Sequence, residues 1–141
     1  MFTPIDETDL KLLQLLKENA RMPYSKLAKE LGISESAVRK RISKLVKSGI
    51  IKKITIEYEL ENEIKAIILV KTQPPVPVPE VSKNIKKIPG IDIVYEVTGE
   101  YDMIVIARAT GVEMINKFID EIRSTPGVVS TYTMIVLRTW I

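Results

Sequence analysis

Residues 32–47 read GISESAVRKRISKLVK, a stretch that joins a helical hydrophobic pattern to a dense set of cations. A core-facing stripe at helical spacing predicts a helix from residue 35 to about residue 48, and its residues are Val38, Ile42, Leu45 and Val46. Ser34 is a favourable N-cap for that helix. The cations of the stretch are Arg39, Lys40, Arg41, Lys44 and Lys47. They indicate either a solvated basic face or a surface for nucleic acid.

Two more helices are predicted ahead of this one, and a strand is predicted after it. DETDLKLLQLLKENA at residues 6–20 carries leucines at helical spacing, with Asp6 or Thr3 as the candidate cap. A shorter helix is expected over residues 24–31. The alternation of apolar residues in 54–58 predicts a strand. Helix, short helix, tight turn, basic helix and strand form the order of a winged helix-turn-helix.

The composition excludes several kinds of chemistry. The chain has 141 residues, of which 45% are hydrophobic and 28% charged, and it contains neither cysteine nor histidine. Disulfides and thiolate or imidazole metal sites are therefore excluded, and the usual proton shuttle near neutral pH is missing. We expect no enzymatic activity, no cofactor and no bound metal. Since the sequence shows neither a bilayer-spanning apolar run nor a signal-peptide pattern, we expect no membrane association and a cytoplasmic location.

Charge is divided unevenly along the chain. Residues 1–53 carry a net charge of +6, and the remaining residues carry −3. The acidic stretch ELENE at 59–63 marks the expected hinge between them. We therefore predict a DNA-binding domain over residues 1–53, a linker strand and hinge over 54–63, and a second domain over 64–141.

The C-terminal part contains an internal repeat. Residues 85–97 read IKKIPGIDIVYEV, and residues 122–134 read IRSTPGVVSTYTM. Each copy is the end of an amphipathic helix, a Pro-Gly stop and a strand. An apolar strand precedes each helix, KAIILVK at 65–71 and YDMIVIARA at 101–109, so the predicted order is strand, helix, strand, strand, helix, strand. The expected fold class is α+β, with a ferredoxin-like βαββαβ domain after the winged helix-turn-helix.

The same pattern predicts a partner for the second domain. Right-handed crossovers place both helices on one face of the sheet. The strands are nevertheless apolar on both faces, as in residues 67–70 and 103–107. An uncovered apolar sheet is an aggregation hazard, so we expect a second copy of the chain to cover it by two-fold symmetry.

The stretch PPVPVP at residues 74–79 is dense in proline. It is a candidate polyproline ligand. A stiff loop that delivers a proline to the first turn of a helix explains the same residues, and we favour the loop.

With these elements in place, the sequence resembles the Lrp/AsnC family, the leucine-responsive or feast/famine transcription regulators of bacteria and archaea. The resemblance covers nearly the whole chain, and its most specific motifs are LAKELGISESAVRKRISKL at 27–45 and VTGEYD at 97–102. It is also carried by DETDLKLLQLLKENAR at 6–21, GII at 49–51, IPGI at 88–91 and TPGVV at 125–129. The Leu-Gly-Tyr-like connector common in the family is replaced here by EYELENEIK.

The resemblance implies a sequence-specific regulator that binds double-stranded DNA as a homodimer or a higher oligomer such as an octamer. It also implies an effector-binding domain whose small-molecule ligand is usually an amino acid. The DNA-contacting residues carried over to this chain are Arg21, Ser34, Ser36, Ala37, Arg39, Lys40, Arg41 and Lys44. Small residues at the helix start would admit it to a major groove, and the cations would pair with phosphates. Arg41 has an alternative role as the partner of an acid such as Glu30.

VTGEYD is the candidate effector loop, and its residues are Gly99, Glu100, Tyr101 and Asp102. Gly99 permits a positive φ, the two acids are acceptors suited to an amino group, and free backbone N–H groups suit a carboxylate. Two acids favour a cationic amino acid such as lysine or arginine. Thr131 and Thr133 share one face of the last strand and would add hydroxyl contacts from a neighbouring subunit. A plain hairpin and ordinary β-propensity are the alternative explanations.

The same two-domain arrangement admits two other functions. Siroheme decarboxylases resemble it, but their chemistry depends on histidine, which this chain lacks. An architectural DNA-binding protein without an effector is the second, and the acidic C-terminal part argues against general coating of DNA.

Overall fold

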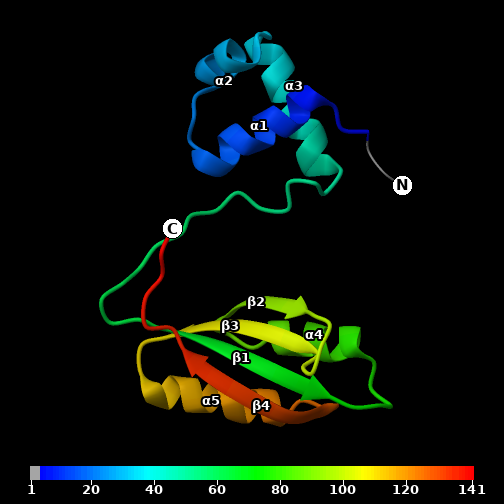
Figure 1. Ribbon diagram of the computed structural model, residues 1–141, viewed down its shortest axis with the longest axis vertical. Helices are drawn as coiled ribbons and strands as arrows, with labels where there is room; N and C mark the ends of the chain where they lie inside the picture. Colours follow the sequence, from blue (N-terminus) through cyan, green and yellow to red (C-terminus); the bar gives the residue numbers. More distant parts are fainter. Residues whose placement is uncertain (1–3) are drawn as a thin grey trace. The chain divides into compact units, whose positions relative to one another are not determined.

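The computed structural model describes residues 4–141 in two compact units, with the border between Tyr58 and Glu59 (Figure 1). The border falls inside the hinge predicted at 54–63. Among the described residues, no helix is long and apolar enough to cross a membrane.

The first unit is a bundle of three helices. They are α1 (Glu7–Glu18), α2 (Tyr24–Leu31) and α3 (Glu35–Lys47), close to the predicted spans. All three helices contribute to one buried core, whose residues are Leu12, Leu27, Ala28, Val38, Ile42 and Leu45. Because the apolar face of α3 points into this core, its opposite face is left at the surface.

Side-chain caps fix where α1 and α3 begin. The Asp6 carboxylate accepts from the Asp9 N–H at 2.8 Å, and the Asp9 carboxylate accepts from the Asp6 N–H at 3.3 Å. Ser34 Oγ accepts from the Ala37 N–H at 3.1 Å. Each bond satisfies an N–H that the first turn of a helix leaves without a partner. Asp6 and Ser34 are thus confirmed as caps, and the alternative cap Thr3 lies outside the described residues.

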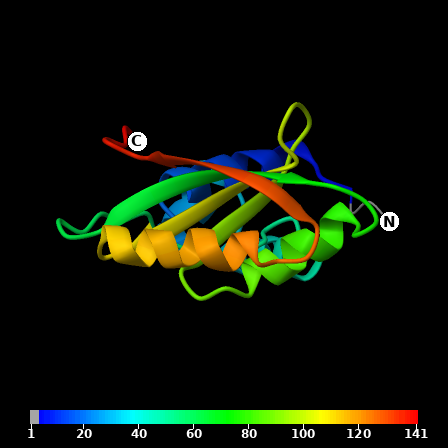
Figure 2. The same ribbon diagram turned by 90° about the horizontal axis from the view of Figure 1, so that it is seen from below.

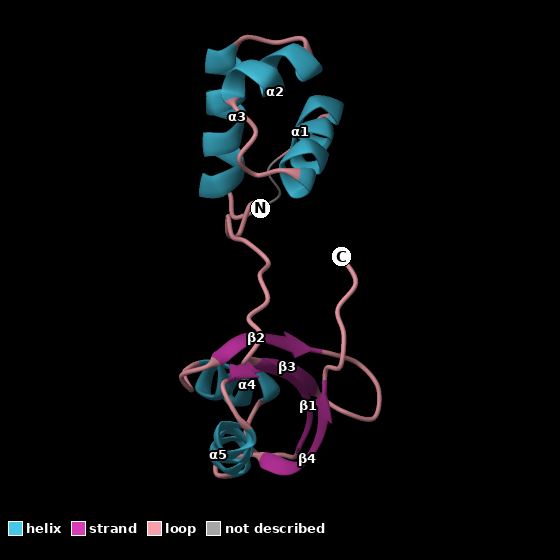
Figure 3. Cartoon of the chain, turned by 90° about the vertical axis from the view of Figure 1, so that its left-hand side faces the viewer, coloured by secondary structure: helices cyan, strands magenta, loops and turns pink. Residues whose placement is uncertain are grey.

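The second unit is an antiparallel sheet with two helices on one face. Its strands are β1 (Ile64–Thr72), β2 (Ile91–Glu96), β3 (Met103–Ala109) and β4 (Val128–Ile135), in the order β2-β3-β1-β4. The crossovers are α4 (Val78–Lys86) and α5 (Val112–Arg123), and both lie on the same side of the sheet (Figure 3). This is the predicted ferredoxin-like βαββαβ order, so the α+β fold class is confirmed.

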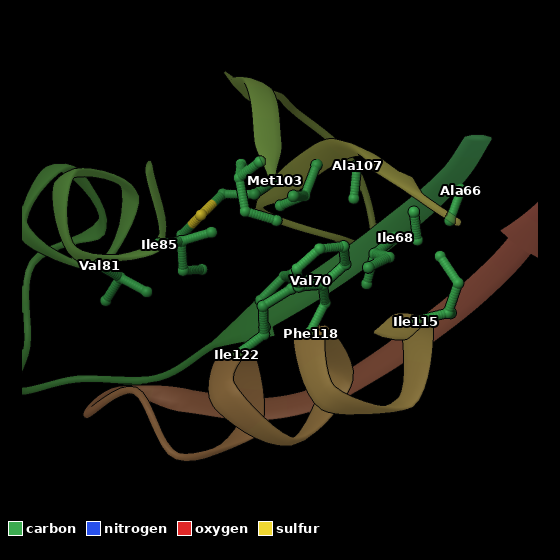
Figure 4. Packing of buried hydrophobic residues seen from close by; sticks show 13 residues of the cluster. Ala66, Ile68, Val70, Val81, Ile85, Met103, Ala107, Ile115, Phe118 and Ile122 are labelled. Atoms are coloured by element: carbon green, nitrogen blue, oxygen red, sulfur yellow. The ribbon is translucent and has the colours of Figure 1, made fainter. Parts of the chain in front are cut away.

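The core of the second unit lies between the helices and the two central strands (Figure 4). Ile68 and Val70 of β1 are fully buried against Ile85 of α4 and Phe118 of α5, which contribute to the same cluster. The strand residues that alternate with these buried ones point to the opposite face of the sheet. The sheet therefore has one face sealed by helices and one face that no helix of this unit covers.

The uncovered face is apolar, as predicted. Cross-strand neighbours form two rows on it: Met134, Ile67, Ile106 and Ile93 in one, and Tyr132, Leu69, Ile104 and Tyr95 in the other. The outer members remain well exposed, with Tyr95 at 50% and Tyr132 at 55%. Apolar rows of this extent mark a surface suited to a protein partner.

The two Pro-Gly stops of the repeat make equivalent turns. Gly90 and Gly127 have φ angles of +94° and +95°. A Cβ on Gly90 would lie 2.9 Å from Phe118 Cε1 in α5, and one on Gly127 would lie 2.9 Å from Val81 Cγ2 in α4. Each glycine thus lets the turn after one helix approach the other helix, which only a residue without a side chain permits at this φ.

The proline-rich stretch is a loop, as predicted. Pro77 precedes α4 as its N-cap residue, and a proline occupies the first turn of that helix. The missing N–H of a proline costs nothing there, because the first N–H groups of a helix have no internal partner.

The strand predicted over residues 54–58 is wrong. These residues are extended but belong to no strand, and Ile54 and Ile56 are 64% and 71% exposed. Alternation alone does not make a strand, because the backbone N–H and C=O groups need a neighbouring strand to bond. The sheet of the described residues contains only β1 to β4, so this segment has no strand beside it.

Candidate nucleic-acid interface and effector site

The exposed face of α3 forms an open basic groove. Its volume is about 740 Å³, and it is lined by Ser36, Arg39, Lys40, Ser43, Lys44, Lys47 and Ser48. Of the predicted DNA-contacting residues, Ser36, Arg39, Lys40 and Lys44 meet here. Ser43, Lys47 and Ser48 belong to the groove as well, although they were not predicted to contact DNA.

Ser34 and Ala37 build the start of α3. Besides capping the helix, Ser34 Oγ lies 3.0 Å from Ser36 Oγ, so the two hydroxyls share a hydrogen bond. The first turn of α3 therefore presents small side chains and a helix N-terminus, which together favour close approach of an anion such as phosphate. Arg21 is exposed in the turn between α1 and α2 and does not line the groove.

Arg41 binds acids of its own unit. Its Nη1 donates to both carboxylate oxygens of Asp6, at 2.9 and 2.8 Å, and to Asp9 Oδ1 at 2.9 Å. Asp9 is only 1% exposed, and its buried carboxylate is compensated by Arg41 and by Lys44, whose Nζ lies 4.0 Å from Asp9 Oδ2. The alternative role proposed for Arg41 is therefore the one that the structure supports. The acids are Asp6 and Asp9, not Glu30, because this side of α3 faces the start of α1.

The same contact changes the ionisation of both partners. The hydrogen bond from Arg41 lowers the pKa of Asp6, and the bond from the Asp9 backbone lowers it further. The bonds to Asp6 and Asp9 raise the pKa of Arg41. Lys44 is also held on this side, since its Nζ donates to the Pro4 carbonyl at 3.1 Å. Arg41 and Lys44 thus fasten α3 to the segment that begins α1.

The remaining cations of the helix are not engaged in this way. Within residues 4–141, Arg39, Lys40 and Lys47 make no salt bridge, and they are exposed. An unpaired cation on a rigid helix is free to bind an external anion without first breaking an internal contact. These three side chains give the groove its available positive charge.

The candidate effector loop joins β2 to β3 and projects on the side of the sheet away from α4 and α5 (Figure 2). Gly99 has a φ of +115° and allows the turn. Glu100 is exposed at the loop tip, and Tyr101 is half-buried. The loop therefore presents one carboxylate and its backbone to solvent.

Asp102 has a structural role within the chain. Its Oδ2 accepts from the Thr72 backbone N–H at 2.7 Å and from Thr72 Oγ1 at 3.1 Å. Its own N–H donates to the Val70 carbonyl at 2.9 Å. Because these bonds anchor the loop to the end of β1, Asp102 positions the loop and offers a ligand fewer free acceptor sites than Glu100 does.

Thr131 and Thr133 lie on β4 opposite Val70 and Ile68, which face the helices. Cross-strand neighbours point to the same face, so the threonines lie on the helix side of the sheet. Thr131 Oγ1 accepts from Arg123 Nε at 3.2 Å. Within one chain the threonines and the tip of the effector loop are therefore on opposite sides of the sheet.

Family models match both units. Residues 5–52 match the model described as winged helix-turn-helix DNA-binding, and residues 65–141 match the Lrp/AsnC ligand binding domain. The chain belongs to the Lrp/AsnC family. Its resemblance to these regulators is thus confirmed, and the groove on α3 belongs to the DNA-binding unit of an Lrp/AsnC protein.

Relatives and solved structures agree along almost the whole length. The chain is 61% identical over 136 residues to the HTH-type transcriptional regulator LysM of Saccharolobus solfataricus, covering 96% of each. It is 42% identical over 142 residues to the HTH-type transcriptional regulator FL11 of Pyrococcus horikoshii, covering 99% of this chain and 93% of FL11. It is therefore a transcription regulator with a DNA-binding and a ligand-binding domain.

Two crystal structures illustrate the shared fold. That of PH0061 superposes with a TM-score of 0.87 at 25% identity, covering 99% of this chain and 97% of that one. The complex of the transcriptional regulator NMB0573 with L-Met from Neisseria meningitidis superposes with a TM-score of 0.77 at 26% identity, covering 96% of this chain and 91% of that one.

One charged cluster of this Lrp/AsnC protein was not predicted from the sequence. Arg108 of β3 bonds Asp92 at 2.7 Å through Nε and Glu63 at 3.2 Å through Nη1. Burial lowers the pKa of Arg108, but the bonds to these two acids outweigh it and raise the pKa overall. The cluster joins the segment before β1 to the bulge in β2. Its signal in the sequence is a lone arginine inside the apolar strand MIVIARA.

Proposed function

We propose that this Lrp/AsnC regulator binds a pseudo-palindromic DNA site with the groove face of α3. The observation that carries the proposal is that Arg39, Lys40 and Lys47 project from one exposed face and have no acid partner within residues 4–141. Lysines pair with phosphates and release counterions, while a guanidinium can bind the O6 and N7 edge of a guanine with two hydrogen bonds.

The other predicted contacts take supporting roles in this proposal. Ser36 and Ala37 let the start of α3 enter the major groove, and Ser34 holds that start in place. Arg21 is proposed to bind a phosphate beside the groove. Arg41 and Lys44 mainly fix the orientation of α3, since both already bond within their own unit.

A symmetric dimer is the proposed binding species. Its support is the uncovered face of the sheet, where two cross-strand rows of apolar side chains meet solvent. A second copy would bury both rows at once under two-fold symmetry, and two DNA-binding units would then read two half-sites. Association of dimers into a higher oligomer such as an octamer is implied by family resemblance.

The proposed effector is an amino acid bound at the loop between β2 and β3. NMB0573, a structural neighbour, is described in complex with L-Met. In this chain, Glu100 would accept from the ammonium group of such a ligand, with Gly99 and Tyr101 beside it on the loop. Thr131 and Thr133 would contribute from a neighbouring subunit. Asp102 keeps the loop in place through Thr72.

A selection experiment tests the interface. The unmodified protein is used to enrich duplexes from a random pool, and fluorescence anisotropy then measures affinity for the enriched site. Arg39→Ala with Lys40→Ala should weaken binding more than tenfold and flatten its salt dependence by about 0.9 per phosphate contact removed. Lys83→Ala in α4 with Lys87→Ala at its C-cap removes the same charge from two exposed positions of the other unit and should have little effect. Equal affinities of the two double variants would show that α3 is not the interface.

Thermal shift with the twenty common amino acids tests the effector. A ligand at 100 times its dissociation constant should stabilise the protein by about 2.7 kcal/mol. Glu100→Gln should reduce that stabilisation, and Glu113→Gln, an exposed acid at the start of α5, should not. If no amino acid shifts the melting temperature, the effector proposal fails while the DNA interface is untouched.

A further inference from the structure

The first residue of α2 lies against the second turn of α3. Arg39 Cζ is 5.0 Å from the centroid of the Tyr24 ring, which is the geometry of a cation–π contact. Tyr24 is half-buried and packs against the core of the helical unit, whereas Arg39 is exposed and lines the basic groove. A ring that is fixed on the core therefore supports a side chain that faces solvent.

This support differs from the one that Arg41 receives. Arg41 Nη1 is committed to the two carboxylates of Asp6 and Asp9. Arg39 makes no hydrogen bond or salt bridge within residues 4–141. A cation–π contact attracts the guanidinium to the ring face without accepting a hydrogen bond from it, so the contact uses none of its N–H donors. Tyr24 thus restrains Arg39 without neutralising its charge or occupying its donors.

We propose that Tyr24 is a positioning residue for DNA binding, which holds the Arg39 guanidinium in the groove before the duplex arrives. The inference rests on the proposed function of α3. A long side chain that is already restrained loses less rotamer freedom on binding, and its donors are presented in one orientation. Tyr24 acts through Arg39 and has no contact of its own with DNA in this proposal.

A double-mutant cycle tests the coupling, using the duplex enriched from the random pool by the unmodified protein. Tyr24→Leu removes the ring face and should weaken binding by about two- to fivefold per subunit. Tyr24→Phe keeps the ring without the hydroxyl and should bind as the unmodified protein does. In the Arg39→Ala background, Tyr24→Leu should cause no further loss. The inference is overturned if Tyr24→Leu weakens binding equally with and without Arg39, or if Tyr24→Phe is as damaging as Tyr24→Leu.

Nuclear magnetic resonance of the free protein gives a second readout that a merely structural role of Tyr24 would not move. The Arg39 δ-methylene protons should show an upfield ring-current shift, and the Arg39 Nε a raised heteronuclear NOE relative to Arg21. Tyr24→Leu should abolish both and Tyr24→Phe should keep both. If Tyr24→Leu loosens the helical unit, the same measurements are made with Tyr24→Met, whose side chain fills more of the volume that the ring leaves. An Arg39 as mobile as Arg21 overturns the inference.

The two kinds of failure are distinguishable. If Arg39→Ala alone leaves DNA affinity unchanged, the assigned interface on α3 is wrong, whatever the spectra show. If Arg39→Ala weakens binding but Tyr24→Leu does not, the interface stands and the positioning role of Tyr24 is refuted.

Discussion

Replacing Gly90 by alanine should destabilise the ligand-binding unit for two separable reasons. The backbone φ of +94° is unfavourable for a residue with a Cβ, at a cost of roughly 1–2 kcal/mol. The new Cβ would also lie 2.9 Å from Phe118 Cε1 and closer still to its Cζ. Phe118 is 4% exposed and cannot move aside freely, so overpacking should add about 1–3 kcal/mol. The expected total loss is about 2–5 kcal/mol.

Gly99→Ala is the matched control, because Gly99 lies in the same unit with a φ of +115° and has nothing within 4 Å of the position that a Cβ would take. It should cost only the backbone part, about 1–2 kcal/mol. Amide hydrogen exchange of peptides from β1 and β3 measures the opening free energy of this unit directly. In a Phe118→Leu background, the excess cost of Gly90→Ala over Gly99→Ala should shrink. If the two glycine variants are equally destabilised with Phe118 in place, the close approach of turn and helix is not what requires Gly90.

Two further predictions concern charge and burial. Because Arg41 lowers the pKa of Asp6, this contact stabilises the fold above the ordinary aspartate pKa and is lost as pH falls through the lowered value. Asp6→Asn, which can still cap α1, should remove that acid dependence from thermal melts and leave the remaining pH profile unchanged. Ile68→Ala, at a fully buried position, should destabilise the unit by about 2–5 kcal/mol. Ile67→Ala on the uncovered face should mainly weaken the proposed dimer, which light scattering measures.

Local patterns predicted much of this structure. The helical spacing of Val38, Ile42 and Leu45 was sufficient to place α3, and all three are buried. The prediction that Val46 faces the core with them is wrong, because this residue is 47% exposed. The repeated Pro-Gly stops predicted both crossovers, since a helix end and a left-handed residue are encoded within a few positions. These features depend on neighbours in the sequence, which is why the residues alone reveal them.

Contacts between distant residues were less accessible. Arg41 meets Asp6 and Asp9 across 35 and 32 positions, and the basic stretch alone contains nothing that separates this cation from Arg39. The two acids of VTGEYD look alike in the sequence, yet Asp102 is bonded to Thr72, 30 positions earlier, while Glu100 is exposed. Only the fold shows which polar groups are already satisfied.

The difference between cations that bond within their own unit and cations that do not changes the charge expected at the proposed DNA interface. Counting all five cations of GISESAVRKRISKLVK on both subunits of a dimer would give a slope of log affinity against log salt of about −9. Arg41 and Lys44 bond within their own unit, which leaves three cations per subunit on α3 and a slope from this helix of about −5. Arg41→Gln should therefore lower thermal stability while leaving the salt slope nearly unchanged. Lys47→Ala should make the salt slope shallower while leaving thermal stability nearly unchanged. Anisotropy titrations over a range of salt concentrations separate these outcomes. A slope that falls in Arg41→Gln as much as in Lys47→Ala would mean that Arg41 leaves its acids to meet the phosphates.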